Sequence, residues 1–179
     1  MVEAVAFVHK AAPVAVLFSP DAVQIIDIFR SLGDFEETYD IDALDRIEAT
    51  LACVLNRDDA KSVVSDALLL AFGLRRERRE ALDFAPVGSR RGTLDEYRLL
   101  ALIGASHVQD EGTVSDAVAA LDIIRAWPLV ALASDIARRL EAAGLTLQCP
   151  DRRLLRLAAK DGALLNHPGA AHPRRPAAG

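Results

Sequence analysis

The chain has 179 residues, of which 51% are apolar and 5% aromatic, and it carries a net charge of −5 at neutral pH. This length suits one domain with a core of its own, and the acidic balance argues against a general polyanion-binding protein. No apolar run is long enough to span a bilayer. Two cysteines, Cys53 and Cys149, cannot build a disulfide framework. We therefore expect buried free thiols in a cytoplasmic protein without membrane attachment.

The composition favours helices, because alanine, leucine, arginine and glutamate are abundant while aromatic residues are few. Eighteen arginines stand against three lysines. A GC-rich genome explains this ratio most simply, and we expect a bacterial source. We predict an all-α fold, a single-domain helical bundle of about six or seven helices over residues 1–162. Residues 163–179 are rich in proline and alanine and are predicted to be a disordered tail.

Apolar stripes at helical spacing, separated by capping residues, glycines and prolines, outline the helices. The first helix begins after Ser19 and ends at Gly33, so the acidic residues 34–40 are predicted to form a loop. Gly73 stands near the end of the third helix, which residues 75–82 can extend by a turn or two. The predicted helices cover residues 20–33, 42–55, 59–73, 94–107, 115–124, 129–143 and 151–160.

Polar side chains mark the starts of several helices. Thr93 and Glu96 match a capping box, in which a hydroxyl is followed three residues later by a carboxylate. This pattern predicts that a helix begins at residue 94. The other expected N-caps are Asp58 or Asp59 for the third helix and Thr113 or Ser115 for the fifth.

Two stretches depart from the helical pattern. Residues 84–92 are rich in proline and glycine and predict a clear break between helices. Residues 145–149 alternate apolar and polar side chains, which is typical of a short strand. We expect them to pair with residues 14–18 as a minor two-stranded β element.

Few residues form a catalytic pattern. Ser106 and His107 are neighbours, but adjacent side chains on a helix point about 100° apart and cannot form a nucleophile–base pair. The glycines match neither a dinucleotide-binding nor a phosphate-binding loop, and no metal-ligand motif is present, so we expect no cofactor. One enzyme hypothesis remains, a metal- or ligand-binding helical cavity built from His107, Asp110, Glu111 and the acids near Asp40.

Charge is distributed unevenly along the chain. Seven acids stand between Asp34 and Glu48, and six arginines stand between Arg75 and Arg91. Like charges at this density need counter-charges from the other cluster, a second copy of the chain or a partner. Arginine suits carboxylate partners and desolvated interfaces. The residues that we expect in a protein interface are Arg75, Arg76, Arg78, Arg79, Arg90, Arg91, Asp34, Glu36 and Glu37.

The C-terminal part of the chain carries a basic stripe. Residues 74–179 have a net charge of +3, and three bases fall at i, i+4 and i+8 on the last predicted helix. A helix, a turn and a basic helix over residues 128–160 resemble a DNA-binding layout in outline, although the connection over residues 144–150 is longer than a tight turn. The candidate nucleic-acid contacts are Arg138, Arg139, Arg152, Arg156 and Lys160.

These patterns give one leading hypothesis and two alternatives. We expect a protein that acts through protein–protein interaction, as an adaptor, regulator or assembly factor, with a homodimer as one form of self-association. The alternatives are a nucleic-acid-binding transcriptional regulator and the helical enzyme described above. The arginine cluster fits a solvated helix end equally well, because runs of surface charge contribute little beyond solubility.

Overall fold

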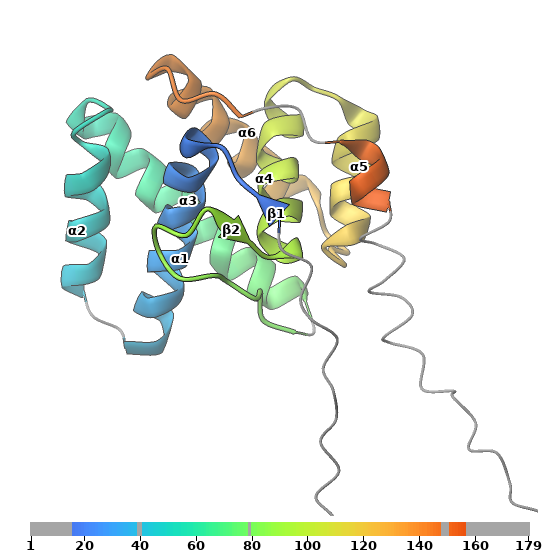
Figure 1. The fold of residues 1–179 in the computed structure, drawn as a ribbon, viewed down its shortest axis with the longest axis horizontal. Coiled ribbons are helices and arrows are strands. Elements are labelled where there is room, and N and C mark those ends of the chain that lie inside the picture. The colour runs from blue at the N-terminus through green and yellow to red at the C-terminus, as the bar shows by residue number, and fades with distance from the viewer. Residues whose placement is uncertain (1–15, 39–40, 79, 148–150, 157–179) are drawn as a thin grey trace, which may run out of the picture.

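The computed structural model describes residues 16–38, 41–78, 80–147 and 151–156 (Figure 1). It is an all-α bundle with a small two-stranded antiparallel sheet, which confirms the predicted fold class. The predicted tail, residues 163–179, lies outside the described residues. The elements in chain order are β1 (Val16–Leu17), α1 (Pro20–Thr38), α2 (Ile41–Leu51), α3 (Arg57–Glu77), β2 (Arg91–Gly92), α4 (Leu94–His107), α5 (Glu111–Ala120) and α6 (Trp127–Ala142), followed by one helical turn over residues 152–156.

Helix α4 forms the centre of the core. Residues 99–106 are all buried, as the continuous apolar run in this part of the sequence predicts. Helix α4 packs against α5 and α6, helix α3 packs against α6, and α1 and α2 pack against α3. In Figure 1, α1 and α2 lie on one side of α4 and α5 lies on the other. Among the described helices, none has the length and apolar character that a bilayer span requires.

Helix α1 runs past the glycine at which the sequence predicts its end. It continues through Gly33 to Thr38, so the loop predicted over residues 34–40 is wrong for residues 34–38. A Cβ atom at Gly33 would lie 3.7 Å from the ring of Phe84. An interior glycine costs a helix only about 1 kcal/mol relative to alanine, which is less than the burial of Ile25, Ile26 and Phe29 on the same helix contributes. The glycine therefore does not end the helix.

Helix α3 also continues beyond a glycine. It passes through Gly73 and ends at Glu77, which is part of the extension that the sequence allows. A Cβ atom at Gly73 would overlap the side chain of Leu129 on α6. The absence of a side chain therefore lets α3 and the first turn of α6 approach closely.

Side-chain caps stand at four helix starts of the described chain, and at α1 the N–H of Ala22 donates to Ser19 Oγ (3.2 Å). Helix α4 begins with the predicted capping box: the N–H of Glu96 donates to Thr93 Oγ1 (3.1 Å), and the N–H of Thr93 donates to Glu96 Oε2 (2.8 Å). Asn56 caps α3 and Asp110 caps α5, because their oxygens stand three residues before the backbone donors. The N-caps predicted for these two helices are wrong. Asp58, Asp59, Thr113 and Ser115 lie inside the helices instead.

The minor sheet forms with a partner that the sequence does not predict. Strand β1 falls within the expected residues 14–18, but it pairs antiparallel with β2, so that Val16 faces Gly92. The partner expected at residues 145–149 is wrong, since the described part of it forms no strand. Leu145 is buried, and its N–H donates to the last turn of α6. Leu145 therefore packs against the end of α6 and does not join a strand.

Helix α2 ends earlier than the apolar stripe suggests. It stops at Leu51, and the N–H of Val54 donates to the carbonyl of Leu51 (3.0 Å) as the chain turns away. Val54, within the predicted helix 42–55, is 48% exposed. Cys53 is also exposed, so the prediction that this thiol is buried is wrong. Cys149 lies outside the described residues.

Gly92 occupies the tightest position in the sheet. A Cβ atom there would overlap the ring of Phe18 and lie 2.8 Å from Glu96 Oε2, and both neighbours are buried. We predict that Gly92→Ala lowers the free energy of unfolding by about 1–3 kcal/mol, as measured by urea denaturation. Gly33→Ala is the control, because its Cβ would lie at an ordinary contact distance of 3.7 Å from Phe84 and alanine favours α1. Equal losses in the two variants would contradict this account.

Candidate functional site

A buried ion pair joins α1 to α4. Arg30 Nε donates to Glu96 Oε1 (2.7 Å), and Arg30 Nη2 donates to Glu96 Oε2 (3.0 Å), which is the two-pronged geometry of a strong arginine–carboxylate pair. The two side chains are 1% and 0% exposed. Charges removed from water this completely are costly unless they are paired and hydrogen-bonded. The pair therefore holds the two helices in a fixed relation.

The carboxylate of Glu96 also accepts hydrogen bonds from the backbone around the connecting loop, which we define as residues 80–90. The N–H of Ala85 donates to Oε1 (2.9 Å), and the N–H of Thr93 donates to Oε2 (2.8 Å). Each oxygen thus receives one guanidinium bond and one backbone bond. Glu96 serves at once as a capping residue, an ion-pair partner and an attachment point for the loop.

Helix α1 holds the same loop from the other side. Arg30 Nη1 donates to the carbonyl of Ser89 (2.9 Å) and to Asp27 Oδ1 (2.9 Å). The carboxylate of Asp27 in turn accepts the N–H of Gly88, at 3.0 Å to each oxygen. The N–H of Asp83 also donates to Asp95 Oδ2 of α4 (3.2 Å). Side chains of α1 and α4 therefore fasten the connecting loop at four backbone positions.

The surroundings of Arg30 keep it charged. Burial disfavours its charged form, but the hydrogen bonds to Glu96 and Asp27 and the negative charges of both carboxylates outweigh this and raise the pKa of Arg30. Because the pKa of Arg30 is raised on folding, its contribution to stability is complete below the ordinary arginine pKa and is lost only as the pH rises through the folded-state value. Arg30 therefore stays charged near neutral pH.

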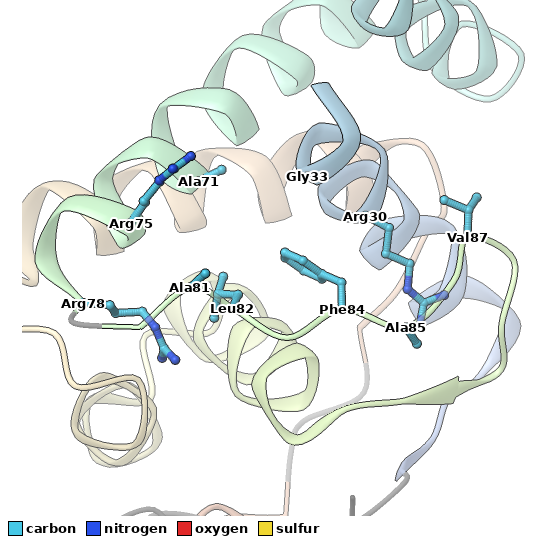
Figure 2. A pocket seen from close by; sticks show the side chains of 10 residues that line it. All are labelled: Arg30, Gly33, Ala71, Arg75, Arg78, Ala81, Leu82, Phe84, Ala85 and Val87. Atoms are coloured by element: carbon cyan, nitrogen blue, oxygen red, sulfur yellow. The ribbon is translucent and has the colours of Figure 1, made fainter. Parts of the chain in front are cut away.

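A pocket of about 480 Å³ lies between α1, α3 and the connecting loop (Figure 2). In Figure 2, Arg75 and Arg78 lie on one side of the pocket, Arg30 and Val87 lie on the other, and Phe84 projects from the loop between them. Gly33 and Arg30 contribute the wall from α1. The remaining lining residues are small or aliphatic, namely Ala71, Ala81, Leu82, Ala85 and Val87.

Two of the predicted interface arginines bind within the domain. Arg78 Nη1 donates to the carbonyl of Leu121 (2.9 Å), and Arg78 Nη2 donates to Asp95 Oδ2 (3.1 Å). This arginine therefore connects the end of α3 to the end of α5 and the start of α4. Arg90 reaches the carbonyl of Phe18 beside the sheet (3.4 Å). Both residues have structural roles that the charge pattern does not reveal.

The other predicted interface residues fall into two groups. Arg75, Arg76 and Arg91 are exposed, the first two on the last turns of α3 and the third on β2. The predicted acids belong to the last turns of α1, where the structure describes their backbone but not their side chains. Those acids are Asp34, Glu36 and Glu37, and the remaining predicted interface residue, Arg79, lies outside the described chain. Asp40, which was named for the enzyme hypothesis, lies outside it as well.

The predicted basic stripe turns partly inward. Arg152 Nε and Arg156 Nε both donate to Asp116 Oδ2 of α5, at 2.9 Å and 3.2 Å. The guanidinium of Arg152 also lies directly over Gly112. These two arginines therefore attach the turn over residues 152–156 to α5.

The candidate arginines of α6 likewise have acidic neighbours. Arg139 Nη1 donates to Asp66 Oδ2 of α3 (2.5 Å), and Arg138 Nη2 donates to Asp135 Oδ1 (3.3 Å). Lys160 lies outside the described residues. Charge that faces carboxylates is less available to phosphates, so nucleic-acid binding stays a prediction without added support.

The residues proposed for an enzyme site do not converge. His107 contacts Glu141 of α6. Asp110 instead caps α5, and hydrogen bonds from the Thr113 side chain and backbone lower its pKa. Glu111 is exposed in the first turn of α5. Within the described chain, no group of three or more histidine, cysteine, aspartate or glutamate side chains could hold a metal ion.

The pocket was not predicted by sequence reasoning. Residues 84–92 show only a loss of helical pattern, yet Phe84 and Val87 of this stretch help to line the cavity. A sequence signal was present, since two large apolar residues in a proline- and glycine-rich loop need a surface against which to pack. No family model, curated protein or solved structure matches the chain. The geometry of the site is therefore the basis for any functional assignment.

We predict that Glu96→Gln lowers the free energy of unfolding by about 3–5 kcal/mol, because it removes the buried carboxylate that binds Arg30 at two atoms and leaves Asp27 as the charged partner. Urea denaturation followed by circular dichroism measures the loss. Glu48→Gln on the surface of α2 is the control and should change stability by less than about 0.5 kcal/mol. Arg30→Met combined with Glu96→Gln should cost less than the sum of the single changes. Additive losses would show that the two charges do not depend on each other.

Proposed function

We propose that the protein acts by binding another protein, as an adaptor, regulator or assembly factor, through the surface at the C-terminal end of α3. The observation that carries this proposal is the 480 Å³ pocket, whose walls combine Phe84 and Leu82 with the guanidinium groups of Arg75 and Arg78. Aromatic residues and arginine are enriched at the centres of protein interfaces, and binding energy concentrates where such residues fill pockets.

The rigidity of the pocket also supports binding. One wall is the connecting loop, which Glu96, Arg30 and Asp27 fasten at Ala85, Ser89 and Gly88. A surface that is already ordered loses less conformational freedom when a partner binds, so more of the contact energy appears as affinity. The exposed arginines Arg75 and Arg76 beside the pocket suit carboxylates at the rim of a protein partner.

We predict that Ala71→Phe abolishes capture of the partner, because the added ring fills the pocket from α3. Affinity capture from the native lysate with mass spectrometry measures which proteins bind the wild type and not the variant. Ala49→Phe places the same ring on the exposed face of α2, outside the lining of the pocket. This control should capture the same proteins as the wild type. Identical capture by all three proteins would overturn the proposed function.

A further inference from the structure

Residues 124–127, which we call the 124–127 segment, present two large apolar side chains to solvent. Ile124 is 84% exposed and Trp127 is 82% exposed, more than any other large apolar side chain in the described part of the chain. The segment is nevertheless fixed in place. The N–H of Arg125 donates to Glu77 Oε2 (3.2 Å) and Arg125 Nε donates to Glu77 Oε1 (3.0 Å). An ordered apolar projection that contains tryptophan is typical of an interface anchor.

The 124–127 segment lies next to the pocket. Glu77, which holds Arg125, is followed by Arg78, which lines the pocket. Arg78 also donates to the carbonyl of Leu121, close to the start of the segment. Projection and pocket therefore flank one point, the C-terminal end of α3. If a two-fold axis passes near the C-terminal end of α3, the 124–127 segment of each copy faces the pocket of the other copy. The two contacts are then equivalent, and the dimer is closed.

The chemistry of the pocket matches that of the projection. Tryptophan offers a large apolar ring to walls such as Phe84 and Val87, and it is the best π partner for guanidinium groups such as those of Arg75 and Arg78. Pockets that enclose drug-sized ligands have volumes of about 300–1,000 Å³. A volume of 480 Å³ therefore accommodates the indole of Trp127 with a neighbouring aliphatic side chain.

We infer that the partner is a second copy of this chain, and that the 124–127 segment of each copy enters the pocket of the other. This inference rests on the proposed function and names the partner of the same site. It assigns the exposed Trp127 and Ile124 a common role, which the fold of one copy does not give them.

Trp127 is the sole tryptophan among the 179 residues, so the tryptophan emission of the full-length chain reports on this side chain alone. It is largely exposed in one copy and would enter an apolar pocket in the dimer. We predict that the emission maximum of the wild type moves to shorter wavelength as protein concentration rises. Sedimentation velocity on the same samples should show dimer forming over the same concentration range.

Two variants separate the projection from the pocket. Trp127→Ala retains the pocket but contains no tryptophan, while Ala71→Phe retains the tryptophan but fills the pocket. Adding Trp127→Ala protein to Ala71→Phe protein should move the emission to shorter wavelength, whereas adding the double variant should leave it unchanged. If Ala71→Phe lowers the unfolding midpoint, Val87→Arg at the exposed edge of the pocket replaces it.

Each remaining outcome overturns the inference. A shift with both added proteins would show that Trp127 contacts a different surface of the second copy. This dimer would be excluded if neither added protein shifted the emission of Ala71→Phe and if wild-type emission stayed constant up to about 1 mM protein. If Ala71→Phe no longer captures proteins from the lysate but tryptophan emission does not shift on mixing, the pocket binds another protein. This result would contradict the dimer and leave the proposed function in place. Unchanged capture in that experiment would contradict the proposed function itself.

Discussion

The bidentate pair between Arg30 and Glu96 is the interaction on which the rest of the structure depends. It lies in the core between α1 and α4, where charge is tolerated only with a complete set of partners. Those partners include backbone groups of Ala85 and Ser89, so satisfying the charges requires the connecting loop to take one path. Replacing the pair with apolar side chains would leave these backbone groups without partners. The polar core therefore specifies the course of the loop as well as the packing of two helices.

The surface follows from this arrangement. With its backbone fixed, the connecting loop holds Phe84 and Val87 as one wall of the pocket, and α1 and α3 supply the others. On the side of the pocket away from Arg30, Arg78 joins the end of α3 to α4 and α5. The arginine cluster thus divides into residues that hold the domain together and residues, such as Arg76, that remain exposed. One cluster of arginines in the sequence therefore contains both structural residues and exposed residues.

The sequence predicts features that depend on neighbours along the chain. The capping box of Thr93 and Glu96 was predicted correctly because a helix start is set within four residues. The second role of Glu96 was not predictable, because its partner Arg30 stands 66 residues away and no local pattern connects them. The same limit explains the error at Gly33, because the core in which Phe29 and Leu32 of α1 are buried is built from distant segments. The pocket is lined by three segments that are distant in the chain, so its walls could not be predicted together, although Phe84 and Val87 indicated that the loop packs against a surface.

Amide hydrogen exchange at Ala85 tests the central claim most directly, because this loop N–H donates to the buried carboxylate of Glu96. If the ion pair fixes the connecting loop, this amide exchanges only when the domain opens, at a rate comparable to that of core amides such as Leu102 in α4. Exchange of the Ala85 amide as fast as that of the exposed neighbour Val87 would contradict the account, because the loop would then open independently of the core.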